Sequence, residues 1–146
     1  MSFEQNIITD APGIARLLSG VRRVAVLGIK TEAQADQPAF YVPDALQRWG
    51  LEIVPVPVYF PEVQRILGEA VYRRLTDIPG EVDLVNMFRR PQDIPQHLED
   101  LLAKRPRGVW FQSGIRNDEA ARTLAEAGIQ VVQDRCLMVD HRRYGR

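Results

Sequence analysis

A buried strand, a glycine and a helix start follow one another early in the chain, and this order suits the binding of an anion. The apolar run 24–27 stops at Gly28, a polar loop covers 29–37, and a helix begins near Pro38. Glycine lets the backbone approach a ligand closely, and the N–H groups and dipole of a helix start attract phosphate. Only one glycine is present, whereas the dinucleotide fingerprint G-x-G-x-x-G needs three. Two interpretations stay open: a phosphate-binding turn, or an ordinary strand-to-helix connection without a ligand.

Cations occur in the segments that follow the apolar runs. Lys30 lies in the polar loop, and Arg89 and Arg90 leave the run 82–88. An arginine in such a place can hold a phosphate through its planar, forked guanidinium. The alternatives are a solvated surface lysine and arginines paired with neighbouring carboxylates. Since these segments contain almost no carboxylates, they favour an anion receptor over an acid–base catalyst.

Catalytic and metal-binding constellations are hard to find in this sequence. Ser113 follows the run 108–111 but lacks the G-x-S-x-G setting of a hydrolase nucleophile, and helix capping is its alternative role. His97, His141 and the single Cys136 give no zinc-binding spacing. We expect His97 to be solvent-exposed and Cys136 to be a small buried residue, with a reactive thiol as its alternative. We therefore predict no catalytic residue and no metal site.

Composition restricts the class of protein. The 146 residues suffice for one domain, which we predict to cover 1–146. The net charge of zero, with acids and bases interspersed, argues against broad binding to nucleic acid or to an anionic membrane. No apolar run approaches the roughly 20 residues of a membrane helix. One cysteine cannot form an internal disulfide, and the first residues lack a signal-peptide pattern, so we expect a cytoplasmic protein.

Apolar runs and helical patterns alternate along the chain. The predicted strands are 22–28, 51–56, 82–88, 108–111 and 129–132. The predicted helices are 10–19, 39–49, 92–104 and 117–127, with single helical turns in 62–67 and 71–75 and a basic tail at the end. Such alternation predicts an α/β class, namely a Rossmann-like, doubly wound parallel sheet of about five strands with helices on both faces. The expected strand order, 3-2-1-4-5, puts a ligand at the carboxyl edge between the first and fourth strands. Trp49 and Trp110 are expected in the core.

Several motifs follow one another in order along most of the chain. They are VAVLG, QPAFYV, VDLVNMFRRP, VWFQSGI, AGIQVVQDRC and the final LMVDHRR. In this combination the chain resembles the small single-domain CoA-binding proteins, a family related to the N-terminal CoA-binding domain of succinyl-CoA synthetase alpha subunits. The resemblance implies a Rossmann-type fold with coenzyme A, or an acyl-CoA, across the carboxyl edge of the sheet. The synthetases use a phosphohistidine from a further domain, so their ligase chemistry is not expected here.

The resemblance also implies which positions contact the ligand. Those implied for the phosphates are Gly28, Ile29, Lys30, Pro38, Ala39, Tyr41 and Val42. Those implied for the adenosine side and the pantetheine are Val56, Pro57, Phe88, Arg89, Arg90, Pro91, Gln112, Ser113 and Gly114.

Two of these segments depart from the usual family pattern. Ile29 and Lys30 stand where the family commonly has Ala-Ser, and 57–59 replaces an Asn-Pro that is followed by a basic residue. The leading hypothesis is non-catalytic binding of coenzyme A or an acyl-CoA as a small-molecule nucleotide ligand. One alternative is an NAD(P)-dependent enzyme, for which an acidic ribose-binding residue is hard to place. The other is a partner-binding scaffold with a decayed nucleotide site. Apolar edge surface would support a homodimer.

Overall fold

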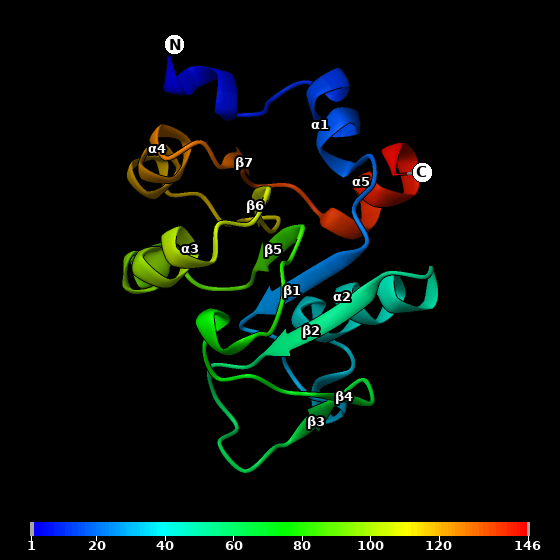
Figure 1. Cartoon of the computed structure of the whole chain (residues 1–146). Helices are drawn as coiled ribbons and strands as arrows, with labels where there is room; N and C mark the ends of the chain where they lie inside the picture. Colours follow the sequence, from blue (N-terminus) through cyan, green and yellow to red (C-terminus); the bar gives the residue numbers. More distant parts are fainter. Residues whose placement is uncertain (1, 146) are drawn as a thin grey trace.

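The computed structural model describes residues 2–145 as a parallel sheet with helices on both faces (Figure 1). Met1 and Arg146, the ends of the predicted domain, lie outside the described residues. The main sheet contains β1 (Arg23–Leu27), β2 (Glu52–Val56), β5 (Leu84–Met87), β6 (Gly108–Phe111) and β7 (Gln130–Val132), and a hairpin contains β3 (Arg65–Ile66) and β4 (Glu69–Ala70). The α-helices are α1 (Ala11–Leu18), α2 (Pro38–Arg48), α3 (Leu98–Lys104), α4 (Asp118–Glu126) and α5 (Leu137–Tyr144). Short 3-10 helices are η1 (Phe3–Asn6), η2 (Glu32–Gln34), η3 (Leu75–Asp77), η4 (Pro91–Asp93) and η5 (Pro95–His97). The predicted Rossmann-like α/β class is confirmed.

The core forms two layers because both faces of the sheet are covered. Successive residues of a strand point to opposite faces, and β5 shows the division: Val85 joins one apolar cluster and Leu84 the other. The cluster of Val85 includes Leu101 of α3 and Leu124 of α4. The cluster of Leu84 includes Leu46 of α2 and further residues of α1 and α5. Figure 1 shows the two groups of helices on opposite sides of the strands.

Two helix starts follow directly from their capping residues. The Asp10 side chain accepts a hydrogen bond from the Gly13 N–H at 3.0 Å and begins α1. Asn117 does the same for the Ala120 N–H, also at 3.0 Å, and begins α4. Short polar side chains are favoured at this position because they satisfy N–H groups that the helix leaves free. Both helices begin within one residue of the predicted starts at 10 and 117.

The order of the strands differs from the predicted 3-2-1-4-5, which was wrong. The sheet reads β2-β1-β5-β6-β7, so β2 is an edge strand and β5 lies beside β1. Pro55 in β2 explains the difference, because proline has no N–H for a second neighbour and is confined to edge strands. Val26 of β1 pairs with Pro55 on one side and with Asn86 on the other. The switch in strand order therefore lies between β1 and β5, and not between the first and fourth strands.

The connection from β2 to β5 contains the hairpin β3–β4 where helical turns were predicted, and the helical turn η3 starts at the end of the predicted range 71–75. The strands β3 and β4 pair antiparallel, and the residues between them, Leu67 and Gly68, have φ values of 56° and 77°. Two successive positive φ values are typical of a type I′ turn, which suits a two-residue hairpin. The Tyr72 N–H then donates to the Pro55 carbonyl at 2.9 Å. The hairpin thus returns the chain along the free edge of β2.

Two helical regions were also predicted with the wrong extent. The expected helix over 92–104 is divided into η4, η5 and α3, because Pro95 cannot donate a backbone hydrogen bond inside a helix. The expected basic tail is the helix α5, which buries Leu137 and Asp140. The Asp140 carboxylate accepts a hydrogen bond from Arg135 Nε at 2.6 Å. This ion pair holds the start of α5 against the end of β7.

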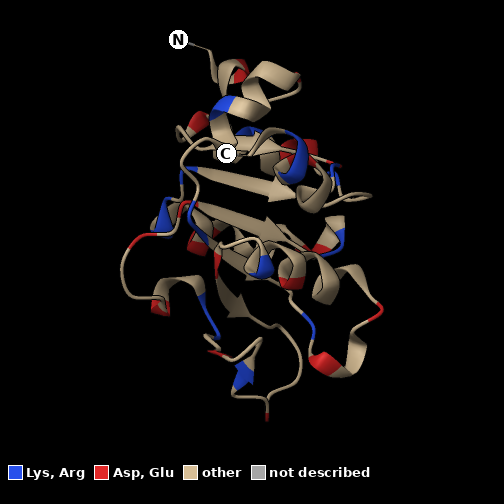
Figure 2. Cartoon of the chain, turned by 90° about the vertical axis from the view of Figure 1, so that its right-hand side faces the viewer, with Lys and Arg blue, Asp and Glu red and all other residues tan. Residues whose placement is uncertain are grey.

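Figure 2 shows basic and acidic residues interspersed along the ribbon. This mixture agrees with the net charge of zero in the sequence. In the described part of the chain no helix is long and apolar enough to span a membrane.

Candidate functional site

Gly28 lies at the switch point, where the carboxyl ends of three strands meet. Its φ is +90°, and a Cβ added there would lie 2.3 Å from the Phe88 carbonyl oxygen. Its N–H donates to the Val56 carbonyl at 2.9 Å, so β1, β2 and β5 are joined at this residue. The added Cβ would also lie 3.3 Å from Cδ of Arg89. The glycine is therefore required by close packing of the chain itself. Four predicted site positions meet here: Gly28, Val56, Phe88 and Arg89.

The loop from Gly28 to α2 places one lysine beside the start of that helix. The Lys30 N–H donates to the Ala39 carbonyl at 3.1 Å, and Lys30 Nζ donates to the side chain of Gln37. Gln37 is the N-cap residue, yet its side chain makes no capping hydrogen bond, and Pro38 follows it. Ile29 points the other way and is 1% exposed in the core. An uncapped helix start next to a lysine ammonium is suited to a phosphate, and Ile29 does not obstruct it.

Arg89 is a buried cation with incomplete charge compensation. Its side chain is 8% exposed, and its Nε donates to Nε2 of His97 at 3.0 Å. The guanidinium carbon lies 5.7 Å from the centre of the Tyr59 ring. The nearest carboxylate oxygen, in Asp93, is 3.9 Å from the guanidinium and also binds Arg90 at 2.7 Å. A desolvated cation that shares a distant carboxylate has capacity to accept a further anion.

Two ionisable neighbours of Arg89, His97 and Asp93, have lowered pKa values. Burial, and then the Arg89 cation, lowers the pKa of the His97 imidazole below its usual value, so the ring stays neutral and can accept the hydrogen bond. A hydrogen bond from Arg90 lowers the pKa of the Asp93 carboxyl. The expectation that His97 is solvent-exposed was wrong, because η5 turns this residue back over the end of β5.

A small pocket of about 180 Å³ lies beside this cluster at the carboxyl edge. Leu27, Pro57 and Leu75 form part of its wall, and His97 separates it from Arg89. Asp100 also lines it, but a hydrogen bond from Arg74 lowers the pKa of that carboxyl, and Arg74 Nη2 lies 2.7 Å from it. The pocket is therefore apolar on one side and carries paired charges on the other.

The third predicted loop uses most of its polar groups inside the protein. Gln112 is 3% exposed, and its Oε1 accepts from Asn86 Nδ2 at 3.2 Å and from the Leu137 N–H at 3.3 Å. The Gly114 N–H donates to Asp134 Oδ1 at 2.6 Å. Ser113 is exposed. Of the donors at 112–114 that were expected to face a ligand, the serine hydroxyl is the one that faces solvent.

The remaining predicted positions divide into buried and exposed ones. Val42 and Val56 are fully buried in the core, and Pro57 is buried at the wall of the pocket. Pro38 and Tyr41 are exposed at the start of α2. The Pro91 carbonyl accepts from Asn117 Nδ2 at 2.9 Å, so the end of β5 is tied to the start of α4. These positions lie at strand ends or at the start of α2, but only some of them present side chains to solvent at the edge.

Three contributors to this edge were not predicted: Tyr59, His97 and Asp93. Asp93 follows Arg89 by four residues, and that spacing was available as a signal for an ion pair within one helical turn. Tyr59 and His97 come from segments with irregular backbone, so no periodic pattern in the sequence indicates which way they face. The expectation that Trp49 lies in the core was also wrong, because it is 44% exposed, whereas Trp110 is fully buried as predicted.

The fold and this edge together define a Rossmann-like α/β domain with cations and an uncapped helix start at the carboxyl ends of its strands. The chain belongs to the CoA binding domain family, whose model matches residues 22–142. It is 34% identical over 128 residues to the uncharacterized protein YneT of Bacillus subtilis strain 168, covering 88% of this chain and 91% of that protein. The predicted family is confirmed.

Solved structures show the same architecture. The structure of ID.343 from Thermus thermophilus is 40% identical, with a TM-score of 0.84, and the match covers 93% of this chain and 99% of that one. A dinucleotide-forming acetyl-coenzyme A synthetase 1 from Ca. Korarchaeum cryptofilum is 16% identical, with a TM-score of 0.67. That match covers 81% of this chain and 26% of the synthetase, and it shows a shared fold.

Proposed function

We propose that the protein binds coenzyme A or an acyl-CoA across the carboxyl edge of its sheet and does not transform it. The observation that carries this proposal is Arg89, a buried guanidinium at the switch point whose nearest carboxylate is 3.9 Å away. Membership of the CoA binding domain family supports the identity of the ligand. Coenzyme A carries phosphate groups that would complete the charge compensation of such a cation.

The residues at the edge suit different parts of this ligand. The start of α2, with the Lys30 ammonium beside it, would hold the diphosphate, because the helix dipole and a cation act together there. Gly28 holds the ends of β1 and β5 close together near this place. The pocket beside His97, with its apolar wall of Leu27 and Pro57, would take an uncharged part of the ligand.

Binding without catalysis is supported by the ionisation of the two carboxyl groups at this edge, Asp93 and Asp100. Asp93 is hydrogen-bonded to Arg90, and Asp100 to Arg74, and each hydrogen bond lowers the pKa of its carboxyl. Carboxylates held ionised in this way are weak bases and poor proton donors near neutral pH. An assay that follows acyl-CoA thioester absorbance in the presence of the protein should show no turnover above the rate without it.

Calorimetric titration with coenzyme A tests the proposal. The Arg89→Gln variant should bind at least about tenfold more weakly, since a hydrogen bond to a charged group contributes about 1.5–3 kcal/mol. Arg48→Gln is the matched control, because Arg48 lies at the opposite end of α2 from the site and its side chain is exposed, and the affinity of this variant should change by less than about threefold. Melting curves of both variants establish that they are folded. If Arg89→Gln fails to fold, Lys30→Gln replaces it, with a smaller loss of affinity expected.

The same titration separates the alternatives. Tighter binding of NAD(H) than of coenzyme A would replace this proposal by a nicotinamide-dependent enzyme. No binding of any nucleotide at millimolar concentration would contradict the proposal and favour a partner-binding scaffold. A cytoplasmic location, suggested by the single cysteine, and a homodimer stay predictions; cell fractionation and sedimentation would test them.

A further inference from the structure

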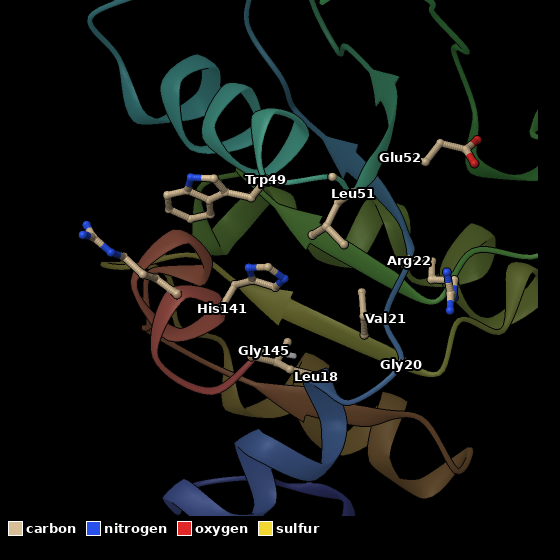
Figure 3. A pocket seen from close by; sticks show the side chains of 11 residues that line it. Leu18, Gly20, Val21, Arg22, Trp49, Leu51, Glu52, His141 and Gly145 are labelled. Atoms are coloured by element: carbon tan, nitrogen blue, oxygen red, sulfur yellow. The ribbon is translucent and has the colours of Figure 1, made fainter.

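A large cleft lies at the amino edge of the sheet, away from the site described above. Its volume is about 800 Å³, and it is lined by the ends of α1, α2 and α5 and by the residues that lead into β1 and β2. Figure 3 shows Trp49 and His141 one above the other at this cleft, with Leu51 and Val21 next to them and Leu18 below. A cleft of this size, lined by apolar and aromatic side chains with a few polar groups, is typical of a small-molecule site.

The aromatic pair gives the cleft a flat surface. The Trp49 and His141 rings are nearly parallel, with an angle of 8° and centroids 6.1 Å apart. Trp49 is 44% exposed, although large aromatic side chains usually bury most of their area. Burial lowers the pKa of the His141 imidazole, so the ring is neutral near physiological pH and offers an uncharged flat surface. The adjoining wall of Leu18, Val21 and Leu51 is less than a tenth exposed and apolar.

The charged residues of the cleft favour an acidic ligand over a basic one. Arg142 and Arg22 line it, and within residues 2–145 neither guanidinium forms an ion pair. Among the described residues, the one acid that lines it, Glu52, is already bound to Arg23 at 2.8 Å. Three helices end here, and their carbonyl groups repel anions from the interior. An acidic group must therefore remain at the exposed mouth while the rest of the ligand enters.

We propose that this amino-edge cleft binds a planar aromatic carboxylate, with its ring against Trp49 and the apolar wall and its carboxylate at Arg142. Arg142 is the better partner of the two arginines because it follows His141 directly, next to the aromatic pair, whereas Figure 3 shows Glu52 on the same side as Arg22. Planar rings stack on tryptophan, and an arginine binds a carboxylate through two parallel hydrogen bonds. The site is separate from the carboxyl edge and does not depend on the binding of coenzyme A.

The two tryptophans make the test direct. Trp49 is exposed at the cleft, whereas Trp110 is buried and its Nε1 donates to the Arg135 carbonyl at 2.8 Å. In a nitrogen–proton correlation spectrum titrated with 2-naphthoate, the indole signal of Trp49 should shift saturably and that of Trp110 should not. The Trp49→Leu variant assigns the signals. A dissociation constant of about 1 mM or tighter is expected for a ligand of this size.

Variants and probe analogues test the two halves of the proposal. Arg142→Gln should weaken 2-naphthoate by about fivefold, the upper range for an exposed charge pair. Arg143→Gln is the matched control: it is exposed on the same helix but does not line the cleft, and it should leave the affinity unchanged. Naphthalene-2-carboxamide and cyclohexanecarboxylate should both bind more weakly than 2-naphthoate, because one lacks the charge and the other the flat ring. Equal binding of all three probes, absence of a saturable shift, or displacement by coenzyme A would overturn the proposal.

Discussion

The two edges of the sheet use their charged groups in opposite ways. At the carboxyl edge Arg89 is buried and hydrogen-bonded to His97, and the neighbouring pocket measures about 180 Å³. At the amino edge the cleft measures about 800 Å³, but the arginines that line it are exposed to water. The comparison teaches that cavity volume alone does not locate a phosphate site. A desolvated cation binds an anion more strongly than a hydrated one, so Arg89 marks the stronger anion site although the pocket near it is the smaller of the two.

The largest difference between the edges should appear on replacing one glycine at each. Gly28→Ala would put a Cβ 2.3 Å from the Phe88 carbonyl oxygen at a φ of +90°. Gly50, which lines the amino-edge cleft, has a φ of +102°, but no atom lies within 4 Å of its added Cβ. In urea denaturation Gly28→Ala should lower the free energy of unfolding by about 4 kcal/mol, from strain and steric overlap together. Gly50→Ala should cost about 1–2 kcal/mol, from strain alone.

The glycine pair also separates packing from ligand access. If both variants lose the same stability, the close contact of Gly28 with Phe88 does not constrain the fold as argued. Gly28→Ala should in addition bind coenzyme A more weakly when it is folded, because β1, β2 and β5 meet at this residue. Gly50→Ala should retain the affinity of the unmodified protein.

A second prediction concerns the buried amide at the carboxyl edge. Gln112→Ala removes the acceptor for Asn86 Nδ2 and for the Leu137 N–H and leaves both donors buried. The free energy of unfolding should fall by about 2–3 kcal/mol, since each unsatisfied buried group costs about 1–3 kcal/mol. Replacing the exposed Gln64 by alanine is the control and should change stability by less than about 0.5 kcal/mol. A loss below 1 kcal/mol for Gln112→Ala would mean that water replaces the amide, so the edge would be wetter than its burial indicates.

The strands and the α/β fold class were predicted well from the sequence, because buried parallel strands are short, continuous apolar runs. Gly108–Phe111 was predicted with the bounds that the structure shows. The strand order was missed although its signal was present: Pro55 inside β2 indicated an edge strand. The hairpin β3–β4 has only two residues in each strand, too few for a period of two to appear.

The candidate site was predicted in part, for a physical reason. Residues that follow strands can be found from the strands, which is how Gly28, Lys30 and Arg89 were identified. Which of them keeps a free polar group depends on tertiary partners that the sequence does not reveal. Gln112 was expected to face a ligand, yet its amide binds Asn86 and Leu137, which are 26 and 25 residues away along the chain. His97 reaches Arg89 only because Pro95 interrupts the helix before it.

The smallest expected effect concerns the two histidines, one at each edge. Burial lowers the pKa of both His97 and His141 in the folded protein. Between that lowered value and the unfolded pKa of about 6.5, the unfolded chain binds more protons than the folded one. The stability that the neutral rings contribute is therefore complete above about pH 6.5 and decreases as the pH falls towards the folded pKa values.

Melting curves between about pH 7.5 and 5.5 measure this dependence without titrating the ordinary carboxyls, whose unperturbed pKa values are about 4. His97→Gln and His141→Gln should each make the melting temperature less dependent on pH over this range, and the double variant should flatten it most. Burial is the first cause of both shifts, and at His97 the Arg89 cation also lowers the pKa while Asp100 and Asp93 raise it. If neither single variant changes the pH dependence, the neutral state assigned to the two rings is wrong.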